Sequence, residues 1–294
     1  MKTLLNKVIL LLSLTSLLVA TEVRLEVLGS GGPELDGRAS SSYIVWIDNK
    51  AKALIDTGSG SMLRFEQSGA KIEDLEAVLL THLHIDHVVD LPSYIKAGYF
   101  SKRNWVLTVI GPDENRYFPS TTEYLENLFG SNGAYRYMQD VLTPQSDSFE
   151  LKGINITQDE ITRYRFNSFE VDIIKVYHGI VPALAFKINV DGKSILFSGD
   201  TSNKKGMLNK LAKGVELFVA DHAVPEHTGK FAKDLHMTPS VIANVAHKGA
   251  VKKLLLSHRM NRSLGKEEES LKIISNIYKG SILFAEDRMR ITLE

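Results

Sequence analysis

A dense histidine cluster at residues 81–90, T-H-L-H-I-D-H-V-V-D, constrains this chain more than any other feature. Three of the nine histidines and one aspartate, Asp86, fall within six residues here, directly after A-V-L-L, a run typical of a buried strand. His82 and His84 are two residues apart and would share one face, while Asp86 and His87 would come from the following turn. Three imidazoles packed together need a cation or hydrogen-bond partners, and the alternative is an exposed polar loop. The cluster predicts a site for zinc, manganese or iron.

Single polar residues follow several other expected strands. His178 follows D-I-I-K-V-Y, Asp200 follows I-L-F-S-G, and His258 follows K-K-L-L-L-S. Asp56 has the same placement after A-L-I. Each of these alone would more often be a surface or hydrogen-bonded residue, but three of them after a dense histidine cluster favour a shared site. A two-metal site needs more ligands than the cluster supplies, and these residues are the candidates.

The composition excludes several classes of site. The chain has 294 residues, 44% of them hydrophobic, which suits one large domain or two small ones. Its formal net charge is zero, so the surface as a whole gives no reason to expect a polyanionic partner such as nucleic acid. No cysteine is present, which excludes disulfides, a thiol nucleophile and thiolate ligands. Any metal must therefore be held by nitrogen and oxygen atoms.

The N-terminus has the pattern of an export signal. The basic start M-K-T-L-L-N-K is followed by an apolar run from Val8 to Ala20 and then by polar T-E-V-R. The run is short for a membrane span, which needs about 20 apolar residues. We expect residues 1–20 to be a cleaved signal peptide and the mature protein to be periplasmic or secreted, with no stable membrane span. The alternatives are a retained N-terminal anchor or a buried first helix.

Alternating and apolar runs predict many short strands. They are expected at 23–28, 42–47, 53–55, 77–80, 105–111, 169–177, 183–190, 194–198, 215–220 and 252–257. Helices are expected at 119–129, from Pro239 onward after an N-cap at Thr238, and at 266–278. Residues 99–165 are the least regular part. Because no linker is visible, we expect residues 21–294 to form one α+β domain, with two packed sheets and helices outside.

These motifs together resemble those of the metallo-β-lactamase superfamily. The resemblance rests on H-L-H-I-D-H, H-G-I at 178–180, F-S-G-D-T at 197–201 and L-L-L-S-H at 254–258, and it covers residues 22–294. The ordered set is most similar to the RNase Z-like and phosphodiesterase branch, and far more specific than any single motif. The resemblance implies a four-layer αββα sandwich with a site for two divalent metal ions, zinc first and manganese or iron as alternatives.

The resemblance also assigns a role to each ligand position. It implies that one metal is held by His82, His84 and His178. It implies that the second is held by Asp86, His87 and His258, with Asp200 bridging the two. Asp56, in I-D-T-G, matches an aspartate that supports the metal loop without binding metal.

The resemblance implies that Asp86 is catalytic, together with a pair of residues outside the ligand set. L-F-V-A-D-H-A at 217–223 aligns with a segment that carries a glutamate in the branch, so Asp221 stands in its place. D-L-H-M-T at 234–238 puts His236 in the place of the branch's catalytic histidine. The pair would help to protonate the leaving oxygen. The alternatives are an N-terminal helix cap for His236 and a strand-end carboxylate for Asp221.

Two arginines near His258 are candidates for binding an anionic substrate. Arg259 and Arg262 could hold a phosphate, sulfate or carboxylate beside a metal centre. The alternative is a solvated loop, which is the stronger interpretation for Arg262.

The predicted function is metal-dependent hydrolysis by a bridging hydroxide, on small phosphodiesters or related esters. RNase Z proteins carry a long RNA-gripping arm, in many cases between the equivalents of His178 and Asp200. Only 21 residues intervene here, so no nucleic-acid partner is expected. A lactonase or arylsulfatase using the same centre is one alternative, and a non-catalytic metal-binding protein is another. Dimers are common in the branch, so a homodimer is a candidate assembly.

Overall fold

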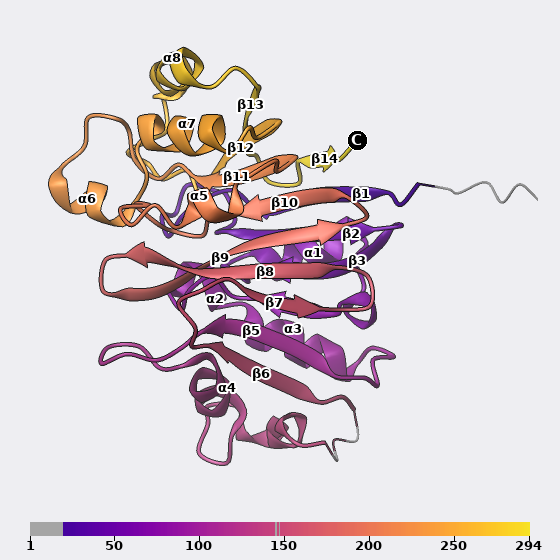
Figure 1. Ribbon diagram of the computed structural model, residues 1–294. Helices are drawn as coiled ribbons and strands as arrows, with labels where there is room; N and C mark the ends of the chain where they lie inside the picture. The colour runs from indigo at the N-terminus through magenta and orange to yellow at the C-terminus, as the bar shows by residue number, and fades with distance from the viewer. Residues whose placement is uncertain (1–19, 145, 147) are drawn as a thin grey trace, which may run out of the picture.

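The computed structural model describes residues 20–144, 146 and 148–294, which form two seven-stranded sheets packed face to face (Figure 1). The first sheet has the order β14-β1-β2-β3-β4-β5-β6 and the second has the order β13-β12-β11-β10-β9-β8-β7. The strands of the first sheet are β1 (Val23–Gly29), β2 (Ser42–Ile47), β3 (Lys50–Ile55), β4 (Ala77–Leu79), β5 (Leu107–Pro112), β6 (Leu151–Ile156) and β14 (Arg290–Thr292). The strands of the second sheet are β7 (Thr162–Arg165), β8 (Glu170–His178), β9 (Val181–Val190), β10 (Lys193–Phe197), β11 (Leu217–Asp221), β12 (Lys253–Ser257) and β13 (Ser281–Phe284).

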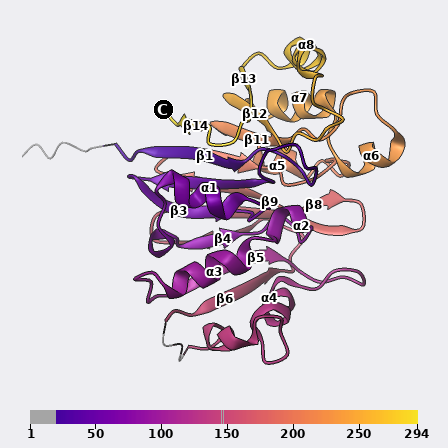
Figure 2. The same cartoon turned by 180° about the vertical axis from the view of Figure 1, so that it is seen from behind.

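Helices cover the outer faces of both sheets (Figures 1 and 2). They are α1 (Ser61–Ser68), α2 (Ile85–Val88), α3 (Leu91–Tyr99), α4 (Thr121–Phe129), α5 (Leu208–Leu211), α6 (Lys230–Leu235), α7 (Pro239–Lys248) and α8 (Glu267–Ile277), with short 3₁₀ helices η1 (Ile72–Asp74) and η2 (Arg136–Leu142). Side chains of α1, α3 and α4 pack on the first sheet, and those of α5, α7 and α8 pack on the second. The predicted four-layer αββα sandwich is confirmed.

The strand β2 shows why apolar runs in this sequence become strands that are covered on both sides. Tyr43, Val45 and Ile47 point into the core between the two sheets. Ile44 and Trp46 point the other way and pack beneath the helices of the first sheet. Because successive side chains alternate between faces, a strand covered on both faces needs apolar residues at nearly every position.

Some elements were not predicted from the sequence. The edge strands β6, β7, β13 and β14 fall outside the expected strands. β7 reads T-R-Y-R and is only half-buried, and β6 contains a lysine, a glycine and an asparagine. Edge strands bury less apolar surface, so their sequences carry a weaker hydrophobic pattern. By contrast, the three expected helices form at 121–129, 239–248 and 267–277.

Parallel strand pairing places the ends of several strands at one edge of the sandwich. In the first sheet β3, β4 and β5 run parallel. In the second sheet β10, β11 and β12 run parallel. Loops that follow the carboxyl ends of parallel strands meet at a common edge, where open α/β sheets usually place their ligands. The candidate ligands follow strands of both sheets and therefore meet there.

The predicted signal segment, residues 1–20, lies outside the described residues except for Ala20. Within the described ranges, no helix is both long enough and apolar enough to cross a membrane.

The core between the sheets can be tested with Phe186 of β9, whose side chain is fully buried there. Phe186→Ala should lower the free energy of unfolding by about 3–5 kcal/mol, because it removes a large buried ring and leaves a cavity. Urea unfolding of the metal-free chain measures this change. The matched control is Phe100→Ala, since the Phe100 ring is 83% exposed and its loss should change stability by less than about 0.5 kcal/mol. Equal unfolding midpoints for the two variants would contradict this account of the core.

Candidate metal centre

The first group of predicted ligands forms around the loop that follows β4. One ligand atom from each member lies within 4.8 Å of the others, and the members are His82, His84, His178 and Asp200. His82 Nε2 lies 3.0 Å from His84 Nδ1. His178, the last residue of β8, is buried, and its ring centroid lies 5.3 Å from that of His84. The rings of His82 and His178 are buried, whereas His84 is partly exposed.

The second group consists of Asp86, His87 and His258. The short helix α2 supplies Asp86 and His87, and His258 follows β12 with a positive φ of 50°. His258 Nε2 lies 3.3 Å from the Asp86 carboxylate. The two imidazoles are stacked, with ring centroids 5.1 Å apart.

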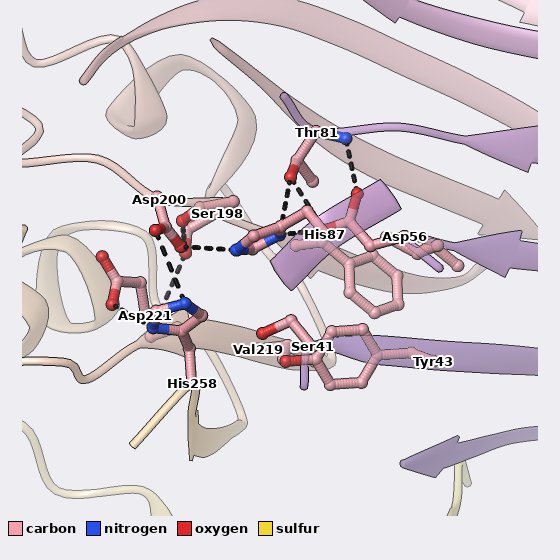
Figure 3. A pocket seen from close by; sticks show the side chains of 14 residues that line it. Ser41, Tyr43, Asp56, Thr81, His87, Ser198, Asp200, Val219, Asp221 and His258 are labelled. Atoms are coloured by element: carbon pink, nitrogen blue, oxygen red, sulfur yellow. Dashed lines mark hydrogen bonds and ion pairs between the residues drawn. The ribbon is translucent and has the colours of Figure 1, made fainter. Parts of the chain in front are cut away.

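The carboxylate of Asp200 lies between the two groups. Its Oδ2 atom is 3.8 Å from His178 Nε2 and 3.5 Å from His258 Nε2. Its Oδ1 atom is 3.5 Å from His87 Nε2 (Figure 3). The six other predicted ligands therefore lie in two groups on either side of the buried Asp200 carboxylate, where the resemblance implies a bridging residue.

The unpaired ring nitrogens show that the donor set fits metal ions. His87 Nε2 and His178 Nε2 are buried without a hydrogen-bond partner, which is costly for a polar atom. The opposite nitrogen of each ring is held in place, because His87 Nδ1 lies 2.7 Å from Asp56 and His178 Nδ1 lies 2.8 Å from the Leu235 carbonyl oxygen. A hydrogen-bond partner on the far side of the ring leaves the inward nitrogen free to bind a cation. His/Asp groups of this kind are consistent with the two-metal site of the fold.

Asp56 supports the loop that carries the histidines (Figure 3). It follows β3, and its carboxylate accepts hydrogen bonds from the Thr81 amide at 2.7 Å and from the Thr81 hydroxyl at 2.7 Å. The same carboxylate fixes His87. Burial raises the pKa of Asp56, against the opposing effect of His87. Asp56 thus contacts the loop and one ligand, as the predicted supporting residue should.

The electrostatics of the centre are dominated by burial and by carboxylate–imidazole contacts. Burial alone would raise the pKa of Asp200, but His258 and His87 outweigh it and hold the pKa well below its usual value. Burial opposes protonation of His87 and His258, yet Asp200 and the other carboxylates raise their pKa values to about 9 and about 10. Burial lowers the pKa of His82 well below its usual value. The carboxylates thus make this pocket favourable for positive charge, which bound metal ions would supply in place of protons.

The predicted acid–histidine pair is formed beside these ligands. His236 Nδ1 lies 2.8 Å from Asp221 Oδ2, and both side chains are buried. The other oxygen of Asp221 accepts from the Ala223 amide at 3.0 Å, which fixes the carboxylate. Burial lowers the pKa of His236, but Asp221 outweighs this effect and the pKa is raised. Thr238 is the N-cap position of α7, so the N-terminal-cap alternative for His236 is not met, although His236 is the C-cap residue of α6.

The side chains of the two arginines contact residues that are not predicted ligands. Arg259 Nη2 lies 3.4 Å from Glu267, and its guanidinium lies over the Phe284 ring at 5.4 Å. Arg262 Nη2 contacts Met260 Sδ at 3.8 Å. The predicted substrate-binding role of both residues therefore has no support in the geometry, because loop position next to His258 does not determine where a long side chain points.

Sequence reasoning missed several residues that shape the site. A small cavity is lined by three of the predicted ligands together with neighbouring residues (Figure 3). It is lined by Ser41, Tyr43, Ile55, Asp56, Thr81, His87, Phe197, Ser198, Gly199, Asp200, Val219, Ala220, Asp221 and His258. The Tyr43 hydroxyl donates to Ser257 Oγ at 2.7 Å and so fixes the residue before a ligand. Tyr43 comes from a strand without a motif, whereas Ser198 lies in F-S-G-D-T and Thr81 is next to the histidine cluster, so these two residues carried a local signal.

Comparison with known proteins agrees with this geometry. The family model described as the metallo-beta-lactamase superfamily matches residues 35–239. A ribonuclease Z of Clostridium novyi (strain NT) is 24% identical, over 89% of this chain and 96% of its own length. The metallo-beta-lactamase fold protein YhfI from Bacillus subtilis superposes with a TM-score of 0.73 at 18% identity, over 92% of this chain and 99% of its own. A diphosphatase from the PhnP family superposes with a TM-score of 0.67 at 18% identity, over 92% and 98% of the two chains.

The supporting role of Asp56 predicts a defect in metal affinity. The wild-type chain should bind two zinc ions, and Asp56→Ala should weaken zinc binding by roughly 10–100-fold, because the Thr81 loop and His87 lose their shared acceptor. Competition with a chromogenic chelator measures the affinity, and circular dichroism checks that the variant is folded. Asp159→Ala is the control, since its side chain is 89% exposed. Wild-type zinc affinity in Asp56→Ala would show that the contacts of Asp56 do not position the ligands.

Proposed function

Because this chain belongs to the metallo-beta-lactamase superfamily, as a metal-dependent hydrolase similar to ribonuclease Z and phosphodiesterases, we propose that it hydrolyses small phosphodiesters or related esters. The observation that carries the proposal is the buried hydrogen bond between His236 and Asp221, next to the two ligand groups. A proton donor at this place is useful when the leaving group is a poorly stabilised alkoxide.

The ligand groups define where a substrate would react. His82, His84 and His178 would hold one ion, Asp86, His87 and His258 would hold the other, and Asp200 would contact both. Bound there, two divalent metal ions supply an activated water molecule and stabilise charge on the ester oxygens. The protein itself contributes a fixed arrangement of ligands, held from behind by Asp56 and by the Leu235 carbonyl group.

His236 is proposed as the general acid. Its Nδ1 atom is engaged by Asp221, which fixes the ring orientation and favours the protonated imidazole. The ring lies 5.3 Å from that of His178 and 5.9 Å from that of His258, so it is next to both ligand groups. From this place His236 can donate a proton to the oxygen that leaves, while Asp221 stabilises the charged form of the ring.

A small substrate fits this chain better than a structured RNA. The segment between His178 and Asp200 is taken up by the hairpin of β9 and β10, which leaves no length for an RNA-binding arm there. The formal net charge of zero also supplies no general attraction for a polyanion.

Hydrolysis can be tested on bis(p-nitrophenyl) phosphate with the zinc-loaded or manganese-loaded chain. His236→Ala should retain its metal and lose about 10²–10⁴-fold in kcat, since general acid catalysis contributes that much. Asp86→Ala should lose activity together with metal. His227→Ala is the matched control, because His227 is exposed and should keep wild-type activity.

The role of the proton donor has a further signature. The loss in His236→Ala should be larger for a diester with a poor alkyl leaving group than for one that releases p-nitrophenol. An equal loss for both esters would argue against general acid catalysis by His236. A metal-loaded wild type that leaves every phosphodiester intact would refute the phosphodiester proposal, and lactones and aryl sulfates would then be the substrates to test.

We also propose that the protein is exported and works outside the cytoplasm. The first strand begins at Val23, after the expected cleavage point at Ala20, so removal of residues 1–20 would leave the sheet complete. Expression of the full chain in a Gram-negative host, followed by cell fractionation and intact mass measurement, should yield a periplasmic protein that begins at Thr21. A full-length mass in the cytoplasmic fraction would contradict the export proposal.

A further inference from the structure

Apolar side chains are exposed around the mouth of the centre, on the side of His84. Ile85, in the ligand loop, is 75% exposed. Ile180, in the turn between β8 and β9, is 63% exposed, and so is Tyr117 in the loop after β5. These segments lie along the same edge of the sandwich, at the left of Figure 1. Single exposed apolar residues are common, but a group of them beside a charged centre is typical of a ligand-binding surface.

Phe118 brings this apolar surface into contact with the ligand set. Its ring centroid lies 5.8 Å from that of His84, in a tilted arrangement. His84 is the least buried of the histidines predicted as ligands, so this contact lies where a substrate would enter. An aromatic ring here is therefore within reach of a group attached to an ester held at the centre.

Asn115 fixes the position of the Phe118 loop. Its side-chain oxygen accepts from the amides of Tyr117 at 2.8 Å and Phe118 at 3.0 Å, which closes a tight turn. Its own amide donates to the Phe118 carbonyl oxygen at 3.0 Å. Its side-chain nitrogen donates to the carbonyl oxygen of Ile180 at 2.7 Å. The Asn115 side chain thus joins the Phe118 loop to the turn that carries Ile180. This rim of the site is therefore preorganised.

The turn that carries Ile180 is itself tied to the ligand set. It directly follows His178, whose ring is held by the Leu235 carbonyl group. Gly179 has a φ of +62°, and a Cβ atom at this position would lie 2.7 Å from a Leu235 methyl group. The chain is therefore packed tightly against the Leu235 side chain at this turn, so the turn that carries Ile180 lies against the same residue whose carbonyl group orients a ligand.

We propose that Phe118 and Ile180 form an apolar subsite, which we call the Phe118 subsite, that receives an aryl or similar apolar group of the substrate. This inference rests on the proposed hydrolase function and specifies its substrate class: esters that join an acidic group to an apolar alcohol or phenol. Burial of a phenyl ring against Phe118 and Ile180 removes apolar surface from water on both partners, while the acidic group stays at the metal centre. Phe118 acts here as a specificity-determining residue and takes no part in bond breaking.

Binding measurements test the subsite without relying on turnover. Isothermal titration of the zinc-loaded chain with phenyl phosphate and with methyl phosphate should give about tenfold tighter binding of the phenyl compound, in line with one partly buried ring. In Phe118→Ala the preference should fall below about threefold, while the affinity for methyl phosphate and the zinc content stay unchanged. Ile180→Ala should reduce the preference in the same direction. Phe100→Ala, which removes an exposed ring of another surface, should leave it intact.

The outcomes separate this inference from the proposed function. Benzoate and acetate form a second matched pair, because a carboxylate can also bind divalent metal ions if the centre does not accept phosphate. A preference for the aromatic member that disappears in Phe118→Ala supports the subsite, even if no phosphodiester is hydrolysed. An equal preference in wild type and Phe118→Ala, or no preference in the wild type for either pair, would overturn it.

Discussion

The arrangement of the metal centre depends on the buried carboxylate of Asp56. This residue is held in a left-handed backbone conformation, with a φ of 55°, at the point where β3 ends. Its carboxylate accepts two hydrogen bonds from Thr81 and contacts His87, so one side chain joins two neighbouring strands of the first sheet to the ligand loop. Burial of a carboxylate is unfavourable unless its oxygens accept hydrogen bonds. Here the hydrogen-bond partners are Thr81 and His87, which belong to the ligand loop itself.

The second sheet contributes the remaining part of the centre. Asp200, Asp221 and His258 each follow or end one of its parallel strands, next to one another in the sheet. This adjacency lets Asp200 reach both ligand groups and lets Asp221 hold His236 within the same small volume. The concentration of carboxylates and imidazoles in one buried pocket is unfavourable for folding alone, because like charges and unpaired nitrogens are buried together. Cations bound there would relieve that cost, so metal binding and stability are coupled in this fold.

The mouth of the site has a different physical character from its base. The base is made of charged and hydrogen-bonded groups, whereas the His84 side of the mouth carries Phe118 and Ile180. In the function proposed here, the charged base would determine which bond is attacked, and the rim would determine which esters bring that bond into place. Superfamily members can therefore share one centre and differ in substrate through their loops.

The sequence by itself predicted the seven candidate ligands, which the structure brings together, and it determined the class of fold. Several imidazoles close together at the end of a buried strand are unfavourable unless a cation binds them. Long strands such as β2 and β9 can be predicted from the sequence, because burial of their side chains requires an alternating or continuous run of apolar residues. The edge strands β6, β7, β13 and β14 were not predicted from the sequence, because they bury too little apolar surface to need a clear hydrophobic pattern. Only the tertiary structure decided where side chains point: Arg259 turns to Glu267 although it follows a ligand, and Phe118 reaches His84 from a loop without a motif. The physical reason is that a local pattern fixes burial and backbone conformation, whereas contacts between distant segments depend on how the two sheets and their loops pack.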